Sequence, residues 1–197
     1  MKEELREALS QRQKQSIVDP SLTPSAVLVP VYCREGEYYL LFTKRSERVR
    51  YHKGQFSFPG GTYEARDELL LNTALRESEE EIGLMPGDIE VLGELDDTAT
   101  TTSGYIVSPF VVFIPWPYQF TVDKREIERI IEVPISALLD RSCLREETSV
   151  VAGETISQYF YHYQGDVIWG ATARILTQFL NIIRLLVGDS GLECGSK

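Results

Sequence analysis

The chain has 197 residues, of which 43% are hydrophobic and 25% charged, as expected of one globular domain with a substantial core. Its formal net charge of −10 argues against general nucleic-acid binding, so no nucleic-acid partner is expected. No apolar run reaches membrane-spanning length and the charged N-terminus has no signal-peptide core, so no membrane association is expected either.

The three cysteines are far apart in sequence and include no CxxC pair. This spacing is typical neither of a zinc site nor of a disulfide scaffold, and it fits a reducing cytoplasm.

The first residues are predicted to form an appendage. Residues 2–16 are polar and helix-prone, and residues 19–24 contain two prolines and have the composition of a linker. We expect residues 1–24 to be a helical arm and linker, 25–190 one globular domain and 191–197 a C-terminal tail. An arm that packs along the surface or against a partner subunit leaves room for a homodimer.

Two strands are predicted next, at residues 25–33 and 38–43, and a strongly basic run follows at residues 44–53. The run has a single acid, Glu47, against five cations: Lys44, Arg45, Arg48, Arg50 and Lys53. In so acidic a chain this is a local anion-binding patch, and arginine suits phosphate because its planar fork bonds two oxygens together. A solvated basic loop would have the same composition.

A helix is predicted over residues 69–82, because apolar residues recur there at helical spacing and Gly83 supplies the stop. A rotation of about 100° per residue places Glu77, Glu80 and Glu81 on one face. Like charges at this spacing repel each other, so their presence together indicates a hard divalent cation, which prefers oxygen ligands. A solvated acidic face is the alternative interpretation.

The second half of the chain is predicted to contain strands at residues 89–95 and 105–114, and two more strands across residues 147–163. A short helix is expected to end at Leu139, and a long apolar helix to run from Trp169 to about Val187.

Two motifs together resemble those of the Nudix hydrolases. The run Arg76-Glu77-x-x-Glu80-Glu81-x-Gly83-Leu84, after a Gly-rich turn and an acid, is similar to the Nudix box. Either Gly61 and Asp67, with one extra residue in the spacing, or Thr62 and Glu68 take the first glycine and acid positions, and Ser78 replaces an aliphatic residue. The expanded spacing is similar to that of the coenzyme A pyrophosphatase branch.

The upstream pattern L-L-T-x-R-S-x3-R-x3-G-x3-F-P-G-G resembles the motif of coenzyme A-directed Nudix hydrolases, with Phe42 in place of its second leucine. The matching positions are Thr43, Arg45, Ser46, Arg50, Gly54, Phe58, Pro59, Gly60 and Gly61. The resemblance implies substrate contacts from Arg45, Ser46, Arg50, Gln55, Phe58, Gly60 and Gly61.

The resemblance implies an α/β fold, the Nudix α/β/α sandwich with a mixed β-sheet. It implies Mg²⁺ or Mn²⁺ held by the three box glutamates, with Arg76 orienting a box carboxylate, and a further acid, Glu126 or, second, Glu128, that reaches the metal or the water. The implied catalytic residues are Arg76, Glu77, Glu80, Glu81 and Glu126.

The implied substrate is a small-molecule diphosphate, and the implied reaction is hydrolysis of coenzyme A or a derivative to 4′-phosphopantetheine and 3′,5′-ADP. One alternative is a Nudix hydrolase that acts on ADP-ribose or another nucleoside diphosphate derivative. The other is a non-catalytic ligand-binding module on the same fold.

Overall fold

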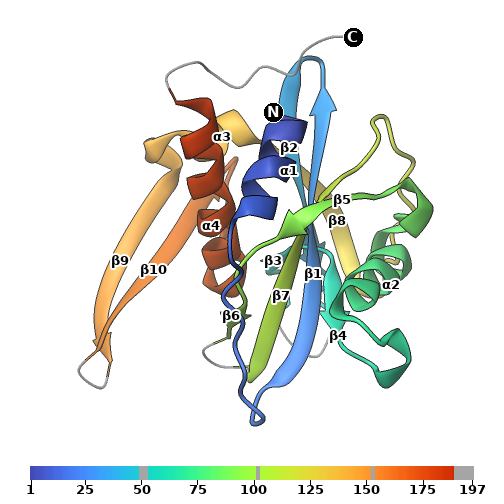
Figure 1. Cartoon of the computed structure of the whole chain (residues 1–197), viewed down its shortest axis with the longest axis horizontal. Helices are drawn as coiled ribbons and strands as arrows, with labels where there is room; N and C mark the ends of the chain where they lie inside the picture. The colour runs from blue at the N-terminus through green and yellow to red at the C-terminus, as the bar shows by residue number, and fades with distance from the viewer. Residues whose placement is uncertain (49–52, 101–102, 152–153, 189–197) are drawn as a thin grey trace.

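The computed structural model describes residues 1–48, 53–100, 103–151 and 154–188, with the backbone alone at 149–151 and 154–156. Arg50 and the C-terminal tail 191–197 of the sequence analysis lie outside the described residues. An eight-stranded sheet forms the centre, a three-stranded sheet stands beside it, and helices cover both faces of the central sheet (Figure 1).

The helices are α1 (Lys2–Gln11), α2 (Leu70–Ile82), α3 (Ile135–Leu139) and α4 (Gly170–Val187), with short 3-10 turns at Ala65–Asp67, Pro86–Asp88 and Arg141–Cys143. The central sheet contains β1 (Thr23–Arg34), β2 (Glu37–Arg45), β3 (Phe56–Ser57), β4 (Gly60–Thr62), β5 (Glu90–Glu94), β6 (Thr98–Ala99), β7 (Tyr105–Phe113) and β8 (Ile127–Pro134). The smaller sheet contains β9 (Leu144–Val151), β10 (Glu154–Tyr163) and β11 (Asp166–Ile168).

Strand β1 organises the central sheet, whose order is β3-β2-β1-β7-β5. It pairs antiparallel with β2 but parallel with β7, so the sheet is mixed as expected. Its first residues pair with β4 on the side opposite β7. A strand buried on both faces is apolar at successive positions, and β1 is buried at residue after residue from Leu28 to Tyr32.

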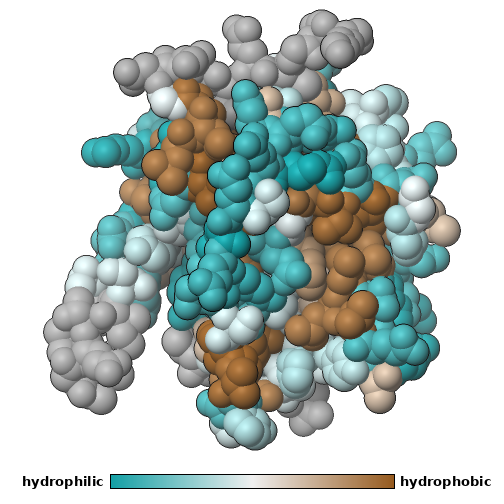
Figure 2. Space-filling view, in the orientation of Figure 1, coloured by the Kyte–Doolittle hydropathy of each residue, from teal (hydrophilic) through white to brown (hydrophobic). Residues whose placement is uncertain are grey.

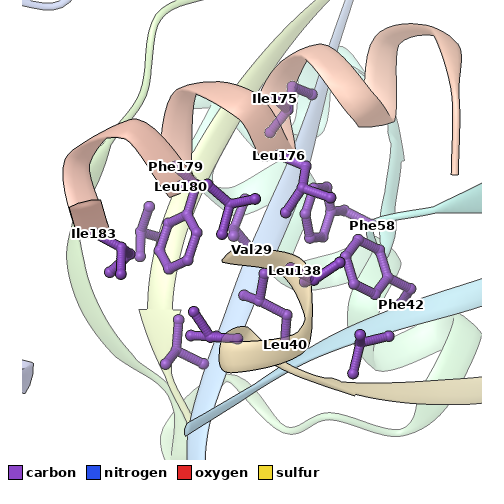
Figure 3. Packing of buried hydrophobic residues seen from close by; sticks show 14 of the residues in the cluster. Val29, Leu40, Phe42, Phe58, Leu138, Ile175, Leu176, Phe179, Leu180 and Ile183 are labelled. Carbon is purple, nitrogen blue, oxygen red and sulfur yellow. The ribbon is translucent and has the colours of Figure 1, made fainter. Parts of the chain in front are cut away.

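The two faces of β1 belong to two separate cores. Val29 and Val31 pack in the cluster that contains α4, whereas Leu28 and Tyr32 pack in the cluster that contains α2. This alternation follows from the two-residue period of a strand. Figure 3 shows one turn after another of α4 contributing to the first cluster, next to Val29 and Leu40. Within the described ranges, no helix has the length and hydropathy needed to cross a membrane.

Helix α1 is shorter and more deeply integrated than the polar arm that the sequence suggests. It ends at Gln11 instead of residue 16, and Leu5 and Leu9 are buried in the same cluster as α4. Lys2 and Arg6 form ion pairs with Glu90 of β5. Its outer face is hydrophilic (Figure 2), which is why the composition conceals a buried pair of leucines four residues apart.

Replacing Leu9 with alanine should therefore destabilise the whole domain, by about 2 kcal/mol, because truncation leaves a cavity in a shared core. The measurement is the urea midpoint of unfolding, with Glu7→Ala on the exposed face of the same helix as a matched control. An equal, near-zero shift for both variants would show that α1 is a dispensable appendage.

Strand β8 was not predicted as a strand. It pairs with β2 from Tyr39 to Arg45, and Ile127, Ile131 and Val133 are buried on one face. Arg129 lies on the same face as these three residues, at a position where a strictly alternating strand would have an apolar residue. Its side chain is exposed and forms an ion pair with Asp166 of β11. That single charge hides the two-residue period of the strand.

One cysteine also differs from expectation. Cys33, near the end of β1, is disulfide-bonded, whereas Cys143 carries a free thiol. The wide separation of the cysteines in sequence gave no signal of this bond.

Candidate active site

Helix α2 carries the acidic motif and matches the predicted helix within one residue. It ends at Gly83, which adopts the left-handed conformation with φ of 69° and donates its N–H to the carbonyl of Glu79. Ser78, in the position where the motif has an aliphatic residue, is fully buried and donates its hydroxyl to the Ala74 carbonyl at 2.7 Å. The departure from the motif is therefore accommodated without an unsatisfied polar group.

Asp67 anchors the start of this region to Arg76. Arg76 donates from Nε to Oδ1 of Asp67 at 2.8 Å and from Nη2 to Oδ2 at 3.0 Å. The hydroxyl of Thr73 and the backbone N–H of Glu64 also donate to Oδ2. These donors, Arg76 foremost, hold the pKa of Asp67 well below its usual range.

The structure thus brings Asp67, and not Glu68, to Arg76. Glu68 is exposed and adopts a φ of 62° at the turn before α2. Of the two alignments that the sequence left open, the geometry supports the one with Gly61, Asp67 and the extra residue.

Arg76 also holds two of the three predicted metal-binding carboxylates. Its Nη1 lies 2.7 Å from Oε1 of Glu77 and 3.5 Å from Oε2 of Glu80. The Glu80 side chain is 57% exposed and lies near Arg66 as well, at 3.8 Å. Arg76 is thus placed to orient Glu77, whereas Glu80 is not among the residues that line the cavity described next.

A cavity of about 880 Å³ opens where β4, β1 and β7 meet the start of α4. Eight of the predicted site residues line it: Arg45, Gln55, Phe58, Gly60, Gly61, Glu77, Glu81 and Glu126. The structure does not bring Ser46, Arg76 or Glu80 to its wall.

The two glycines of β4 form a gap between helix α2 and the cavity. A Cβ atom on Gly61 would lie 2.4 Å from the carboxyl carbon of Glu77, and one on Gly60 would lie 2.2 Å from the carbonyl oxygen of Ala26. Gly60 also donates its N–H to Oε2 of Glu81 at 3.2 Å. Only residues without side chains let these carboxylates reach the cavity past the sheet.

Replacing Gly61 with alanine should therefore reduce activity much more than stability. The new methyl group meets the flexible end of Glu77, which must move, and a displaced catalytic group costs about tenfold to a hundredfold in kcat. Gly60→Ala is the contrast, because its methyl group meets backbone at a φ of 148° and should lower the melting temperature. A Gly61→Ala enzyme with wild-type kcat would show that Glu77 does not need the space left by the missing side chain of Gly61.

The floor of the cavity carries buried carboxyl groups whose ionisation is disfavoured. Glu81 is only 3% exposed, and burial, with Glu77 and Glu126 adding repulsion, raises its pKa to about 8. Burial raises the pKa of Glu77 as well. Arg45, whose Nη1 lies 3.7 Å from Oε1 of Glu81, lowers the pKa of Glu81, but by less than burial raises it.

The donor chemistry of the floor fits a divalent cation. Glu77, Glu81 and Glu126 present hard oxygen ligands to one cavity, and a bound cation would favour the ionised form of Glu81 that burial disfavours. Across the described ranges, no group of three or more His, Cys, Asp or Glu side chains is already gathered as a metal centre. The carboxylates of Glu77 and Glu80 instead contact Arg76.

The basic run 44–53 contacts the loop before β8, which carries Glu126. Ser46 donates its backbone N–H to the carbonyl of Glu126 at 2.7 Å, and this bond joins the two segments. Lys44 lies 3.3 Å from Glu128, which does not line the cavity. Of the two acids weighed from the sequence, the structure therefore brings Glu126 to the site.

Sequence reasoning missed the uncharged part of the cavity wall. Its members come from the start of α4 and from β7 with the loop before it: Trp169, Gly170, Ala171, Thr172, Ile175, Thr100, Ser103, Tyr105 and Val107. None of these residues is charged, so they form no charge pattern in the sequence that could have indicated a binding site. One signal lies in the sequence: Ser103-Gly104-Tyr105-x-Val107-x-Pro109 is similar to a segment of the coenzyme A pyrophosphatase branch.

Comparison with known proteins agrees with this architecture. A family model described as a NUDIX domain matches residues 22–149. The chain is 36% identical over 161 residues to a Photorhabdus laumondii protein named Uncharacterized Nudix hydrolase NudL, covering 82% of this chain and 85% of that protein. A protein of the same name from Yersinia pestis is 37% identical over 154 residues, which are 77% of this chain and 75% of that one.

Among solved structures, a NUDIX hydrolase from Alicyclobacillus acidocaldarius has a TM-score of 0.55. The match is 16% identical and covers 89% of this chain and 98% of that chain. The expected fold class, an α/β sandwich around a mixed sheet, is confirmed.

Proposed function

The chain belongs to the Nudix hydrolase family, and on that basis we propose that it hydrolyses the diphosphate bond of coenzyme A or a close derivative. The products are 4′-phosphopantetheine and 3′,5′-ADP. The observation that carries the proposal is one cavity in which buried carboxylates of α2 face Arg45, the cation of the basic run 44–53 that lies among the described lining residues.

The chemistry is divided among the residues around this cavity. The box glutamates Glu77, Glu80 and Glu81 would hold Mg²⁺ or Mn²⁺, Glu80 after its side chain rotates away from Arg76. The ion would supply positive charge to the diphosphate and lower the pKa of a water molecule. Asp67 fixes Arg76, and Arg76 in turn orients the carboxylate of Glu77. Glu126 accepts the proton of the attacking water, since it faces the cavity and carries a carboxylate.

The basic run favours coenzyme A over substrates with a diphosphate alone. Coenzyme A carries an additional phosphate on its ribose, and an arginine-rich patch beside the diphosphate site suits that group. ADP-ribose lacks this phosphate and would offer no such group to the patch.

The decisive experiment is product analysis after incubation of the purified protein with coenzyme A, with and without Mg²⁺ or Mn²⁺. Metal-dependent release of 3′,5′-ADP is expected. Metal-dependent cleavage of ADP-ribose without cleavage of coenzyme A would move the substrate to the nucleoside diphosphate derivatives. No cleavage of either would favour a ligand-binding module.

A further inference from the structure

The start of α4 lies against β3, at the same end of the cavity as Arg45. Thr172 of α4 donates its hydroxyl to the carbonyl of Phe56 at 3.0 Å. Phe56 pairs with Lys44 of β2, the residue before Arg45. The carbonyl of Gln55, next to Phe56, accepts the backbone N–H of Arg45 at 3.0 Å. The first turn of α4 is therefore bonded to the strand that pairs with the Arg45 end of β2.

A second series of contacts places Trp169 at this end. Asp166 of β11, three residues before Trp169, forms an ion pair with Arg129 at 2.7 Å. The guanidinium of Arg129 in turn lies over the ring of Phe56, 5.9 Å from its centroid. Trp169 thus lies between two residues, Asp166 and Thr172, that are both connected to Phe56. Its place is the β3 end of the cavity wall.

Strand β7 forms the opposite side. Ser25 of β1 pairs with Thr62 of β4 on one side and with Val107 of β7 on the other, and β2 lies on the side away from β7. The described lining from β7 and the loop before it has no charged side chain; it comprises Thr100, Ser103, Tyr105 and Val107. Arg45, the cation of the described lining, is therefore at the same end of the cavity as Trp169.

Trp169 has an aromatic ring available to a ligand. It lines the cavity with 46% of its surface accessible, and its side chain makes no capping hydrogen bond to α4. Among the described residues, no other aromatic ring and no cation contacts its ring. A ring without a protein partner, next to an arginine, suits a nucleotide, whose base stacks on the ring while its phosphate binds the guanidinium.

We propose that Trp169 stacks on the adenine base of the substrate, with a phosphate of the same nucleotide on Arg45. In coenzyme A the base and the additional 3′-phosphate both belong to the adenosine half, whereas the pantetheine half has no aromatic ring and no charge. The uncharged β7 side is left to that second half. The assignment rests on the proposed function for its choice of coenzyme A, and it makes Trp169 a specificity-determining residue.

The first test compares the two reaction products as ligands of the Trp169→Ala protein by titration calorimetry with Mg²⁺ present. The dissociation constant of 3′,5′-ADP should rise about tenfold through loss of base stacking, and that of 4′-phosphopantetheine should change by less than about twofold. Trp169→Phe keeps a smaller ring and should give an intermediate value for 3′,5′-ADP. An equal rise for both products, a rise for 4′-phosphopantetheine alone, or no change would overturn the assignment.

A fluorescence measurement separates this inference from the proposed reaction. In a Trp116→Phe background Trp169 is the remaining tryptophan of the chain, and Trp116 itself stacks on Tyr32 and is not among the lining residues. AMP should quench the fluorescence of Trp169 in a saturable manner, whereas ribose 5-phosphate, which lacks the base, should not. Equal quenching by both would contradict stacking on the base.

The combined outcomes show which proposal fails. If AMP quenches Trp169 but coenzyme A is not cleaved, the proposed reaction is wrong and the adenine site stands. If coenzyme A is cleaved and AMP has no effect on Trp169, the adenine site alone is wrong.

Discussion

Glu81→Gln should abolish most of the hydrolysis and leave the fold as stable as before, or more so. Its carboxylate is buried at the cavity floor, where the proposed cation and diphosphate meet. Removing the charge while keeping the shape should lower kcat by about a thousandfold, within the range for removal of one catalytic group. The measurement is steady-state release of 3′,5′-ADP at saturating Mg²⁺.

The stability of the same variant, measured without metal, has a characteristic pH dependence. The pKa of Glu81 is raised from 4.5 to about 8 by burial, so the wild-type fold loses stability as pH rises from about 4.5 to about 8. Glutamine has no such proton, so the variant should melt at the wild-type temperature near pH 4 and above it at pH 8. Gly60 still finds an acceptor, because the amide oxygen replaces the carboxylate oxygen.

Glu79→Gln is the matched control for these measurements. Glu79 lies on the exposed side of the same helix, two residues before Glu81. It should leave both kcat and the melting temperature unchanged. If Glu81→Gln retained full activity, the Glu81 carboxylate would have no part in catalysis, whatever the stability of the variant.

Asp67→Asn should destabilise the protein by about 3 kcal/mol, because it leaves the half-buried guanidinium of Arg76 without its main charged partner. The pKa of Asp67 is depressed in the folded state, so its contribution is fully present above the ordinary aspartate pKa near 4. The contribution is lost as pH falls below that value toward the folded-state pKa. The difference in unfolding free energy between wild type and variant should therefore be largest near pH 7 and shrink below about pH 4.

Glu68→Gln is the control for Asp67→Asn and tests the alternative alignment of the motif. Glu68 is the neighbouring acid, exposed and remote from the hydrogen bonds to Arg76. Its replacement should change the free energy of unfolding by less than about 0.5 kcal/mol. The reverse order of effects would place Glu68, and not Asp67, in the motif's acid position.

The part of the site that comes from one continuous stretch of the chain, helix α2, could be predicted from the sequence. Helix α2 shows a clear helical period and ends at a glycine that only the left-handed conformation explains, so its bounds and its acidic face followed directly. The alignment of Asp67 could not be decided in the same way. Two adjacent acids fit the motif, and only the hydrogen bonds to Arg76 distinguish them.

The parts that the sequence did not predict depend on contacts between distant residues. Trp169 reaches the cavity because α4 packs on the central sheet, and nothing in its neighbours signals a binding wall. Glu80 shares a helix face with Glu77, as expected, yet Glu77 lines the cavity and Glu80 does not. Helical geometry places a Cα atom well, but it does not decide between the partners of a flexible side chain.

The pairing of β1 also bears on how the protein is made. Of its neighbours, β2 follows at once along the chain, but β7 begins only at residue 105, and β8, which covers the other edge of β2, begins at residue 127. A growing chain therefore exposes an apolar hairpin with two open edges until β7 has been made, and the β2 edge stays open until residue 134 has left the ribosome. Open edges are templates for pairing between molecules. Fragments that end before β8 should therefore aggregate, and chaperones that shield strand edges should matter most during this interval of synthesis.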